Sequence, residues 1–153
     1  MNNDLYYFLL KELNCHRRDL QFDPVLLDKL DNNYRKIIES KLYELCLLGV
    51  VSAFKYIPFI NTIDIDELFS TENLDRYNDI VKYDLCKYGY LTKGNNNLLN
   101  ILYKYALSDI NAYKVLIDLY LACNKEEIFE FLNENVNQDK IGLLESRIYN
   151  RRK

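Results

Sequence analysis

Hydrophobic and polar residues follow a helical spacing along most of the chain, and the clearest case is the stretch Tyr34–Ile60. Between residues 34 and 48 the apolar side chains recur every three or four positions, which gives a helix one apolar and one charged face. Gly49 follows directly, and glycine readily takes the left-handed conformation that ends a helix. A second apolar stripe, Val50–Ile60, predicts an antiparallel return helix, which Pro58 kinks or ends.

The pattern of this hairpin recurs further along the chain. The segment Tyr43–Gly49 is echoed by Tyr83–Gly89, and Asn124 begins a third, looser echo. The expected helix ends at Gly49, Gly89 and Asn124 are 40 and 35 residues apart. That interval is typical of stacked two-helix repeats of the HEAT or armadillo type. The alternative is a helical bundle without repeats, in which similar loop lengths produce such echoes by chance.

The same spacing predicts further helices, for a total of eight or nine, and no strand. Asp23 before Pro24 marks a helix start, and Asp64 with Glu67 resembles a capping box. Thr92–Asn97 is predicted to be a loop. The remaining helices are expected at Leu5–Leu13, from Pro24 to about Leu30, at Asp66–Phe69, from a cap at Ser70 or Thr71 to Gly89, at Leu98–Leu107, at Ile110–Cys123, from Asn124 to about Val136, and from a cap at Asp139 to about Tyr149.

Composition agrees with a soluble, all-α chain. At 153 residues a single domain over residues 1–153 is expected, with 49% hydrophobic and 28% charged residues. Four glycines and two prolines leave little material for the tight turns of a β-sandwich. We therefore predict an all-α fold of antiparallel helical hairpins, stacked as a HEAT- or armadillo-like bundle.

Several functional classes lack their sequence signals. The N-terminus has no signal-peptide pattern, and no apolar segment approaches the roughly 20 residues of a membrane span, so a cytoplasmic protein is expected. Cys15, Cys46, Cys86 and Cys123 form no Cys-x-x-Cys pair, and structural thiols are the simplest interpretation. His16 is the single histidine and is expected on a surface loop. No phosphate-binding loop, nucleophile elbow or histidine pair occurs, so we expect no enzyme activity, metal or cofactor.

Acidic residues are concentrated in two stretches although the net charge is only −3. Seven acidic residues oppose two basic ones between Thr62 and Asp84, and five oppose none between Glu126 and Asp139. Such patches attract basic proteins by electrostatic steering and disfavour nucleic acid. Acidic residues also aid solubility and favour helix starts, which is the local alternative. The candidate partner-binding residues are Asp64, Asp66, Glu67, Glu72, Asp75, Asp79, Glu126, Glu127 and Glu130.

The hairpin echoes in Tyr34–Ile60 and Tyr83–Leu132, with the size and acidic balance, resemble small all-helical immunity proteins of bacterial contact-dependent inhibition and other polymorphic toxin systems. This resemblance implies a cytoplasmic protein that binds a basic toxin domain, often a nuclease, and covers its active site. It implies a protein partner and no direct contact with nucleic acid or membrane.

Two other functions remain open at this point. The chain's size and its bias towards Asn, Ile, Lys and Tyr are also compatible with a viral host-range or Bcl-2-like helical decoy, which binds a partner helix in a groove. An enzyme with an acidic site is the third possibility.

Overall fold

The structure is a computed structural model that describes residues 3–16 and 18–150. Within these residues every regular element is a helix and no strand is present, which confirms the predicted all-α fold. The chain divides into two units, Met1–Val81 and Lys82–Lys153, and each is described by itself. The expectation of one domain over residues 1–153 stays a prediction.

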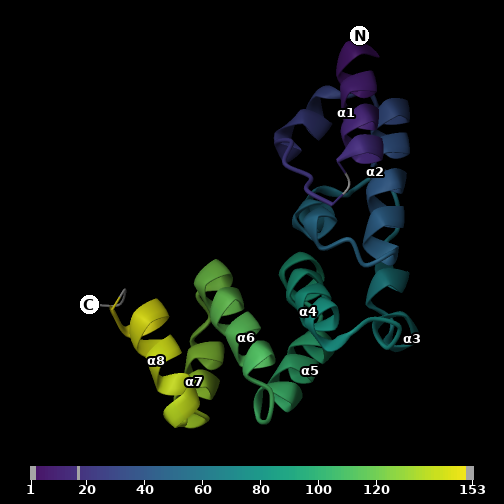
Figure 1. Cartoon of the computed structure of the whole chain (residues 1–153). Helices are drawn as coiled ribbons and strands as arrows, with labels where there is room; N and C mark the ends of the chain where they lie inside the picture. Colours follow the sequence, from purple (N-terminus) through teal and green to yellow (C-terminus); the bar gives the residue numbers. More distant parts are fainter. Residues whose placement is uncertain (1–2, 17, 151–153) are drawn as a thin grey trace. The chain divides into compact units, whose positions relative to one another are not determined.

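The first unit holds α-helices and short 3₁₀ helices, and the second unit is mainly α-helical (Figure 1). The first contains α1 (Asn3–Cys15), η1 (Pro24–Lys29), α2 (Asn32–Leu47), η2 (Val51–Phe59), η3 (Asp66–Phe69) and α3 (Thr71–Leu74). Helix α4 (Asp79–Lys93) lies mostly in the second unit, with α5 (Asn96–Ala106), α6 (Ile110–Cys123), α7 (Glu126–Glu134), α8 (Gln138–Leu144) and a π-helical turn, η4 (Glu145–Tyr149).

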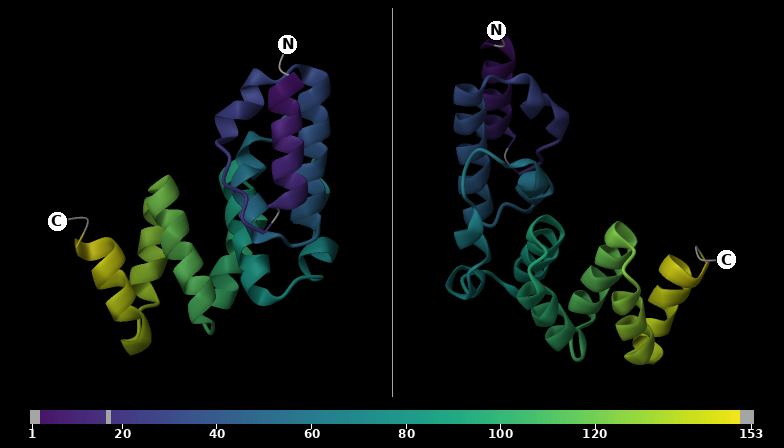
Figure 2. Two further views of the ribbon diagram at one scale, coloured as in Figure 1. Left: turned by 45° about the horizontal axis from the view of Figure 1, so that its top comes forward. Right: turned by 180° about the vertical axis from the view of Figure 1, so that it is seen from behind.

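Helices α1 and α2 lie side by side and run in the same direction (Figure 2). Near their starts the rings of Tyr6 and Tyr34 stack with centroids 4.2 Å apart. Near their ends Leu13 and Leu45 line the same small hollow. This parallel arrangement requires the long connection through η1, which carries the chain back to the start of α2.

The predicted hairpin is present, and its two arms are antiparallel. The Cys46 thiol, near the end of α2, contacts the carbonyl of Ala53 at 3.7 Å, whereas Arg35, near its start, donates to the carbonyl of Phe59 at 2.9 Å. Gly49 has a φ of +77°, as its predicted role requires. The return arm is a 3₁₀ helix rather than an α-helix. Its buried side chains recur about every three residues, which suits three residues per turn; they are Ala53, Phe54, Tyr56, Ile57 and the following Ile60.

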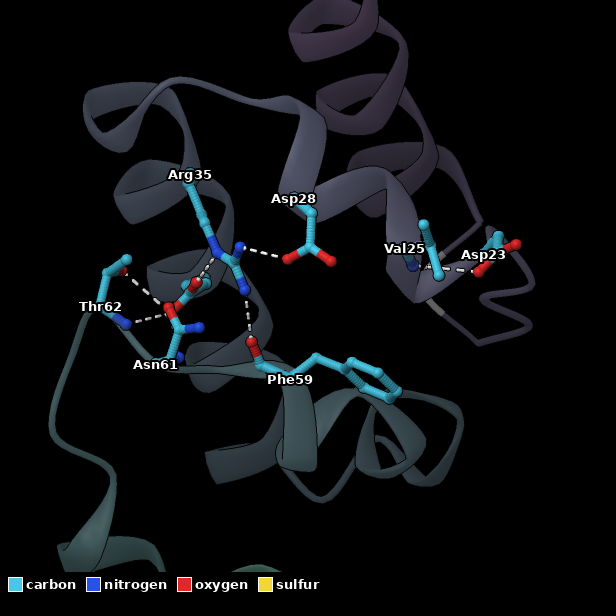
Figure 3. A network of polar contacts seen from close by, with 8 residues as sticks. Asp23, Val25, Asp28, Arg35, Phe59, Asn61 and Thr62 are labelled. Atoms are coloured by element: carbon cyan, nitrogen blue, oxygen red, sulfur yellow. Dashed lines mark hydrogen bonds and ion pairs between the residues drawn. The ribbon is translucent and has the colours of Figure 1, made fainter.

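A buried ionic network fixes the start of α2 against the chain that follows η2 (Figure 3). Glu39 is fully buried, and one of its carboxylate oxygens accepts from Nε of Arg35 at 2.6 Å. Its other oxygen accepts from the backbone N–H groups of Asn61 and Thr62, both at 2.8 Å, and from the Thr62 hydroxyl at 2.9 Å. Both oxygens of this buried charge therefore have partners.

Arg35 carries the opposite charge of the network and joins three segments. Its guanidinium pairs with Glu39 on α2 and with Asp28 on η1 at 2.7 Å, besides the carbonyl of Phe59. Burial by itself lowers the pKa of Arg35, but the hydrogen bonds and charges of Glu39 and Asp28 outweigh it, so the pKa is raised. The group stays charged at any physiological pH.

Helix α6 is the centre of the second unit and packs against α5, α7 and α8 (Figure 1). Its polar stripe is narrow: Asn111 and Asp118 are exposed and Lys114 is half-buried. The opposite side is fully buried and includes Tyr113, whose hydroxyl donates to the carbonyl of Leu132 on α7 at 2.7 Å. This bond explains how a tyrosine is accommodated in an apolar core.

The sequence analysis placed one helix end at the wrong glycine. A continuous helix from residue 71 to Gly89 was expected, but α3 ends at Leu74 and α4 begins at Asp79. Gly89 is buried inside α4, which continues to Lys93 and ends at Gly94, with φ +65°. The expected loop Thr92–Asn97 thus shrinks to residues 94 and 95. The residues with left-handed backbone, Gly49, Gly94 and Asn124, are 45 and 30 residues apart, whereas the predicted helix ends were 40 and 35 residues apart.

Two caps also differ from prediction. Asp64 accepts from the N–H of Asp66 at 2.8 Å, two residues on, so the reciprocal capping box with Glu67 does not form. The cap of α8 is Asn137, which accepts from the N–H of Lys140 at 3.1 Å, and Asp139 lies in the first turn instead. Both differences arise because Asp and Asn cap over more than one spacing. The predicted cap at Asp23 is confirmed, and of the two candidates Ser70 and Thr71 it is Ser70 that caps α3; Asp109 caps α6.

We predict that Glu39→Gln lowers the free energy of unfolding by about 3 kcal/mol or more, because the buried Arg35 loses its buried counter-charge. Asp28→Asn is the matched control, since it removes the other partner of Arg35, whose side chain is 68% exposed. That variant should cost no more than about 1 kcal/mol. Urea unfolding measures the free energy of unfolding of both variants. Equal losses would show that the buried partner Glu39 stabilises Arg35 no more than the exposed Asp28 does.

We also predict opposite effects for two glycine-to-alanine changes. Gly94→Ala should destabilise the fold by about 1 kcal/mol, because its φ of +65° is unfavourable for any residue with a Cβ. Gly142→Ala should stabilise it by about 0.5–1 kcal/mol, because Gly142 is helical and a Cβ there meets nothing within 4 Å. Thermal unfolding measures the change in stability of each variant. A Gly94→Ala variant more stable than Gly142→Ala would contradict the prediction.

Candidate functional site

All nine acidic residues singled out from the sequence have exposed side chains. Six belong to the first unit and form what we call the first acidic surface: Asp64, Asp66, Glu67, Glu72, Asp75 and Asp79. Three belong to the second unit, on α7, and form the second acidic surface: Glu126, Glu127 and Glu130. Each surface is therefore considered on its own.

Most of these carboxylates stand at the start of a helix. Asp66 and Glu67 lie in the first turn of η3, and Asp64, two residues before it, accepts from the N–H of Asp66. The other members in a first turn are Glu72 in α3, Asp79 in α4, and Glu126 and Glu127 in α7. An acidic side chain at a helix start interacts favourably with the partial positive charge there. Local helix stabilisation thus accounts for the position of these residues without any partner.

Two members of the surfaces do not stand at the start of a helix. Asp75 follows the last residue of α3, at the end of a helix where a negative charge is unfavourable. Glu130 lies in the middle of α7, and Glu134 ends the same helix, which has no basic residue in its last turn. These residues add negative charge beyond what helix capping requires, so they are the best probes of a binding role.

The first acidic surface includes an aromatic neighbour that the sequence analysis did not single out. Tyr43 of α2 is half-buried, and its pKa is raised first by burial and then by the negative charges of Glu67 and Asp64. A phenol beside two carboxylates is a favourable place for a basic group, because the ring face and both charges attract a cation. The sequence signal was weak, since Tyr43 lies at the edge of the apolar stripe of α2.

Hydrogen bonds hold the chain of the first acidic surface in place. The hydroxyl of Tyr77 donates to the carbonyl of Leu47 at the end of α2, at 2.6 Å. The amide of Asn73 donates to the carbonyl of Leu68 at 2.7 Å, and Arg76 donates to Asn73 at 3.1 Å. These bonds fix η3 and α3 against α2, so their carboxylates project from an ordered backbone.

The second acidic surface has a cation next to it. Lys125 precedes α7 and donates to the hydroxyl of the buried Tyr90 at 2.8 Å. This bond, together with the charge of Tyr90, is the main cause of the raised pKa of Lys125, and Glu127 contributes less. The positive charge of Lys125 weakens the field of the second acidic surface, as Arg76 does in the first. With six exposed carboxylates against three, the first is the stronger candidate.

The cysteines and the single histidine form no catalytic arrangement in the part of the chain that the structure describes. Cys46 and Cys86 are buried, and burial raises the pKa of each thiol to about 12, as expected of structural residues. Cys15 is exposed, unlike the buried thiol expected there. His16 is exposed as predicted and lines a shallow hollow with Cys15, Arg18 and Asp19.

Asp84 and Asp118 bring two carboxylates of the second unit near each other. Burial is the main cause that raises the pKa of Asp84, Lys87 lowers it, and the charge of Asp118 raises it further. Asp118 pairs with Arg147 at 3.3 Å. A third ligand is missing, and residues 3–16 and 18–150 contain no group of three or more residues that would hold a metal ion.

Comparisons with known proteins leave the identity of this chain open. No protein-family model matches it, and none of the curated proteins or solved structures matches it significantly. Among the described helices, none has both the length and the apolar character needed to cross a membrane.

The raised pKa of Asp84 predicts a pH-dependent contribution to stability. A carboxyl whose pKa is higher in the folded state stabilises the fold fully below its unfolded pKa of about 3.9, and this contribution is lost as the pH rises through the folded pKa. Asp84→Asn should therefore be more stable than the natural chain at pH 7, and its advantage should shrink towards about pH 4. Urea unfolding of both proteins across this range measures the difference, and an advantage independent of pH would contradict the assignment.

Proposed function

We propose that this protein is an inhibitor of a basic protein domain and acts in the manner of a toxin immunity protein. The observation that carries the proposal is the exposure of six carboxylates over residues 64–79, where Arg76 is the single basic residue. Two of them, Glu67 and Asp64, act on the half-buried Tyr43 with their negative charge. Tyrosine is among the residues that contribute most to protein interfaces.

The mechanism we propose is electrostatic capture followed by occlusion. A concentrated negative surface speeds the encounter with a basic partner, and this effect falls steeply with ionic strength. Once bound, carboxylates would occupy the positions at which a basic nuclease domain holds phosphates. In this proposal the inhibitor needs no cofactor and performs no reaction, because it blocks the partner's active site by binding.

The first acidic surface is the proposed contact because it has six exposed carboxylates, whereas the second has three. Asp75 stands where helix capping does not require an acidic residue. The second acidic surface, with Lys125 beside it, supplies general attraction at longer range.

Charge reversal distinguishes the two surfaces. The variant Glu67→Lys, Glu72→Lys, Asp75→Lys leaves the hydrogen bond between Asp64 and the N–H of Asp66 in place and should slow association with the basic domain at low salt by at least about tenfold. The control Glu126→Lys, Glu127→Lys, Glu130→Lys changes the charge equally and should have a smaller effect. Stopped-flow association with the product of the neighbouring upstream gene, at several salt concentrations, gives both rates.

Solvated charges contribute little to stability, so both variants should remain folded, which circular dichroism checks. If the two variants slow association equally, the first acidic surface is not the contact. If the natural chain neither binds the neighbouring product nor rescues cells that express it, the inhibitor function is wrong.

A further inference from the structure

The second unit contains a cleft of about 510 Å³ that none of the nine acidic residues lines. Its lining comes from the turn between α5 and α6 and from the start of α8, and consists of Leu107, Ser108, Ile110, Asn137, Asp139 and Lys140. A volume of this size is sufficient for a small ligand or a short stretch of peptide.

The exposed charged residue in the lining of this cleft is a carboxylate, Asp139, whereas the lysine of the lining is buried. Lys140 is 95% buried, and its ammonium donates to the carbonyl of Ala106 at 2.9 Å. It also lies 3.5 Å from the carbonyl of Asn135 and 4.8 Å from the ring centre of Tyr113. Its positive charge is therefore satisfied inside the unit, by the ends of α5 and α7 and by a ring of α6.

Two carboxylates at the cleft, Asp109 and Asp139, differ in whether the fold already uses them as hydrogen-bond acceptors. Asp109, between two lining residues, accepts from the Tyr83 hydroxyl at 2.8 Å and from the N–H of Asn111 at 2.9 Å, so it is already used within the fold. Asp139 is exposed and lines the cleft. It is the lining residue whose charge is available to a ligand.

The other wall of the cleft is apolar. Leu107 is 60% exposed and Ile110 is 36% exposed, which is costly for aliphatic side chains in a monomer. A wall of this kind beside a carboxylate matches a side chain with an apolar stem and a cationic end. Arginine and lysine have that structure.

We propose that this cleft binds a short basic and apolar segment of a protein partner, an arginine or lysine next to an aliphatic residue. The cationic end pairs with Asp139, while the stem and the aliphatic neighbour cover Leu107 and Ile110. The inference rests on the proposed function, because it gives the same basic partner a second contact, on the second unit. It also specifies the kind of partner segment that the inhibitor binds, a basic residue next to an aliphatic one.

The test is a titration of the ¹⁵N-labelled full chain with the dipeptide acetyl-Leu-Arg-amide, followed by NMR. The amide signals of residues 107–110 and 137–140 should shift in a saturable way. Acetyl-Leu-citrulline-amide has nearly the same shape without the charge and should bind about three- to fivefold more weakly, as expected for one exposed ion pair. Inorganic phosphate should leave these signals unchanged.

Variants of the chain complete the test. Asp139→Asn should weaken the arginine peptide about three- to fivefold, whereas Asp139→Glu should largely retain binding. Glu145→Gln removes the same charge from an exposed residue that does not line the cleft and should have no effect. The overall NMR spectrum shows whether each variant is folded.

Four results would overturn the proposal: no shift at the highest soluble peptide concentration, equal binding of the citrulline peptide, equal effects of Asp139→Asn and Glu145→Gln, or a response to phosphate in place of the peptide. Because the titration requires no toxin, its outcome is separate from that of the proposed function. If the peptide binds but the protein inhibits no basic domain, the proposed cleft site stands and the proposed inhibitor function is wrong.

Discussion

The first unit depends on the buried pair of Arg35 and Glu39. A charge without solvent is unfavourable unless every hydrogen-bonding position is used, and Glu39 meets this requirement with partners from Arg35, Asn61 and Thr62. These partners lie on two segments 22 or more residues apart, so the network fixes where the chain leaves η2. The following residues, 64–79, carry the first acidic surface. The position of that surface is therefore tied to an interaction well inside the unit.

The second unit solves a similar problem with a cation. Lys140 places one ammonium between the carbonyl ends of α5 and α7, where the partial negative charge of both helices stabilises it. The ring of Tyr113 on α6 closes the site. One buried charge thus connects four helices, and Asp139 is the exposed charged residue in the lining of the adjacent cleft.

Helix capping and binding compete as explanations of the acidic residues, and the structure separates them by position. Asp66, Glu72 and Glu126 stand in first turns, where the helix itself favours a carboxylate. Asp75 lies at the end of α3 and Glu130 lies within α7, so neither negative charge is explained by a helix start. This separation gives the inhibitor proposal a sharper form than the count of acidic residues, because it identifies the side chains whose replacement leaves the helix starts intact.

The sequence by itself determined the all-α fold, the Tyr34–Ile60 hairpin with its end at Gly49, and the exposure of the acidic stretches. These features depend on the spacing of apolar residues and on the backbone preference of single residues. Both can be read from a short stretch of sequence. Tertiary structure decided that Gly89 lies inside a helix while Gly94 ends it, because a glycine's role depends on what packs against it. It also decided that Glu39 and Lys140, which read as surface charges, are buried, since their partners are distant in sequence. Burial of a charge requires partners from several segments at once, and no local pattern records where those segments meet.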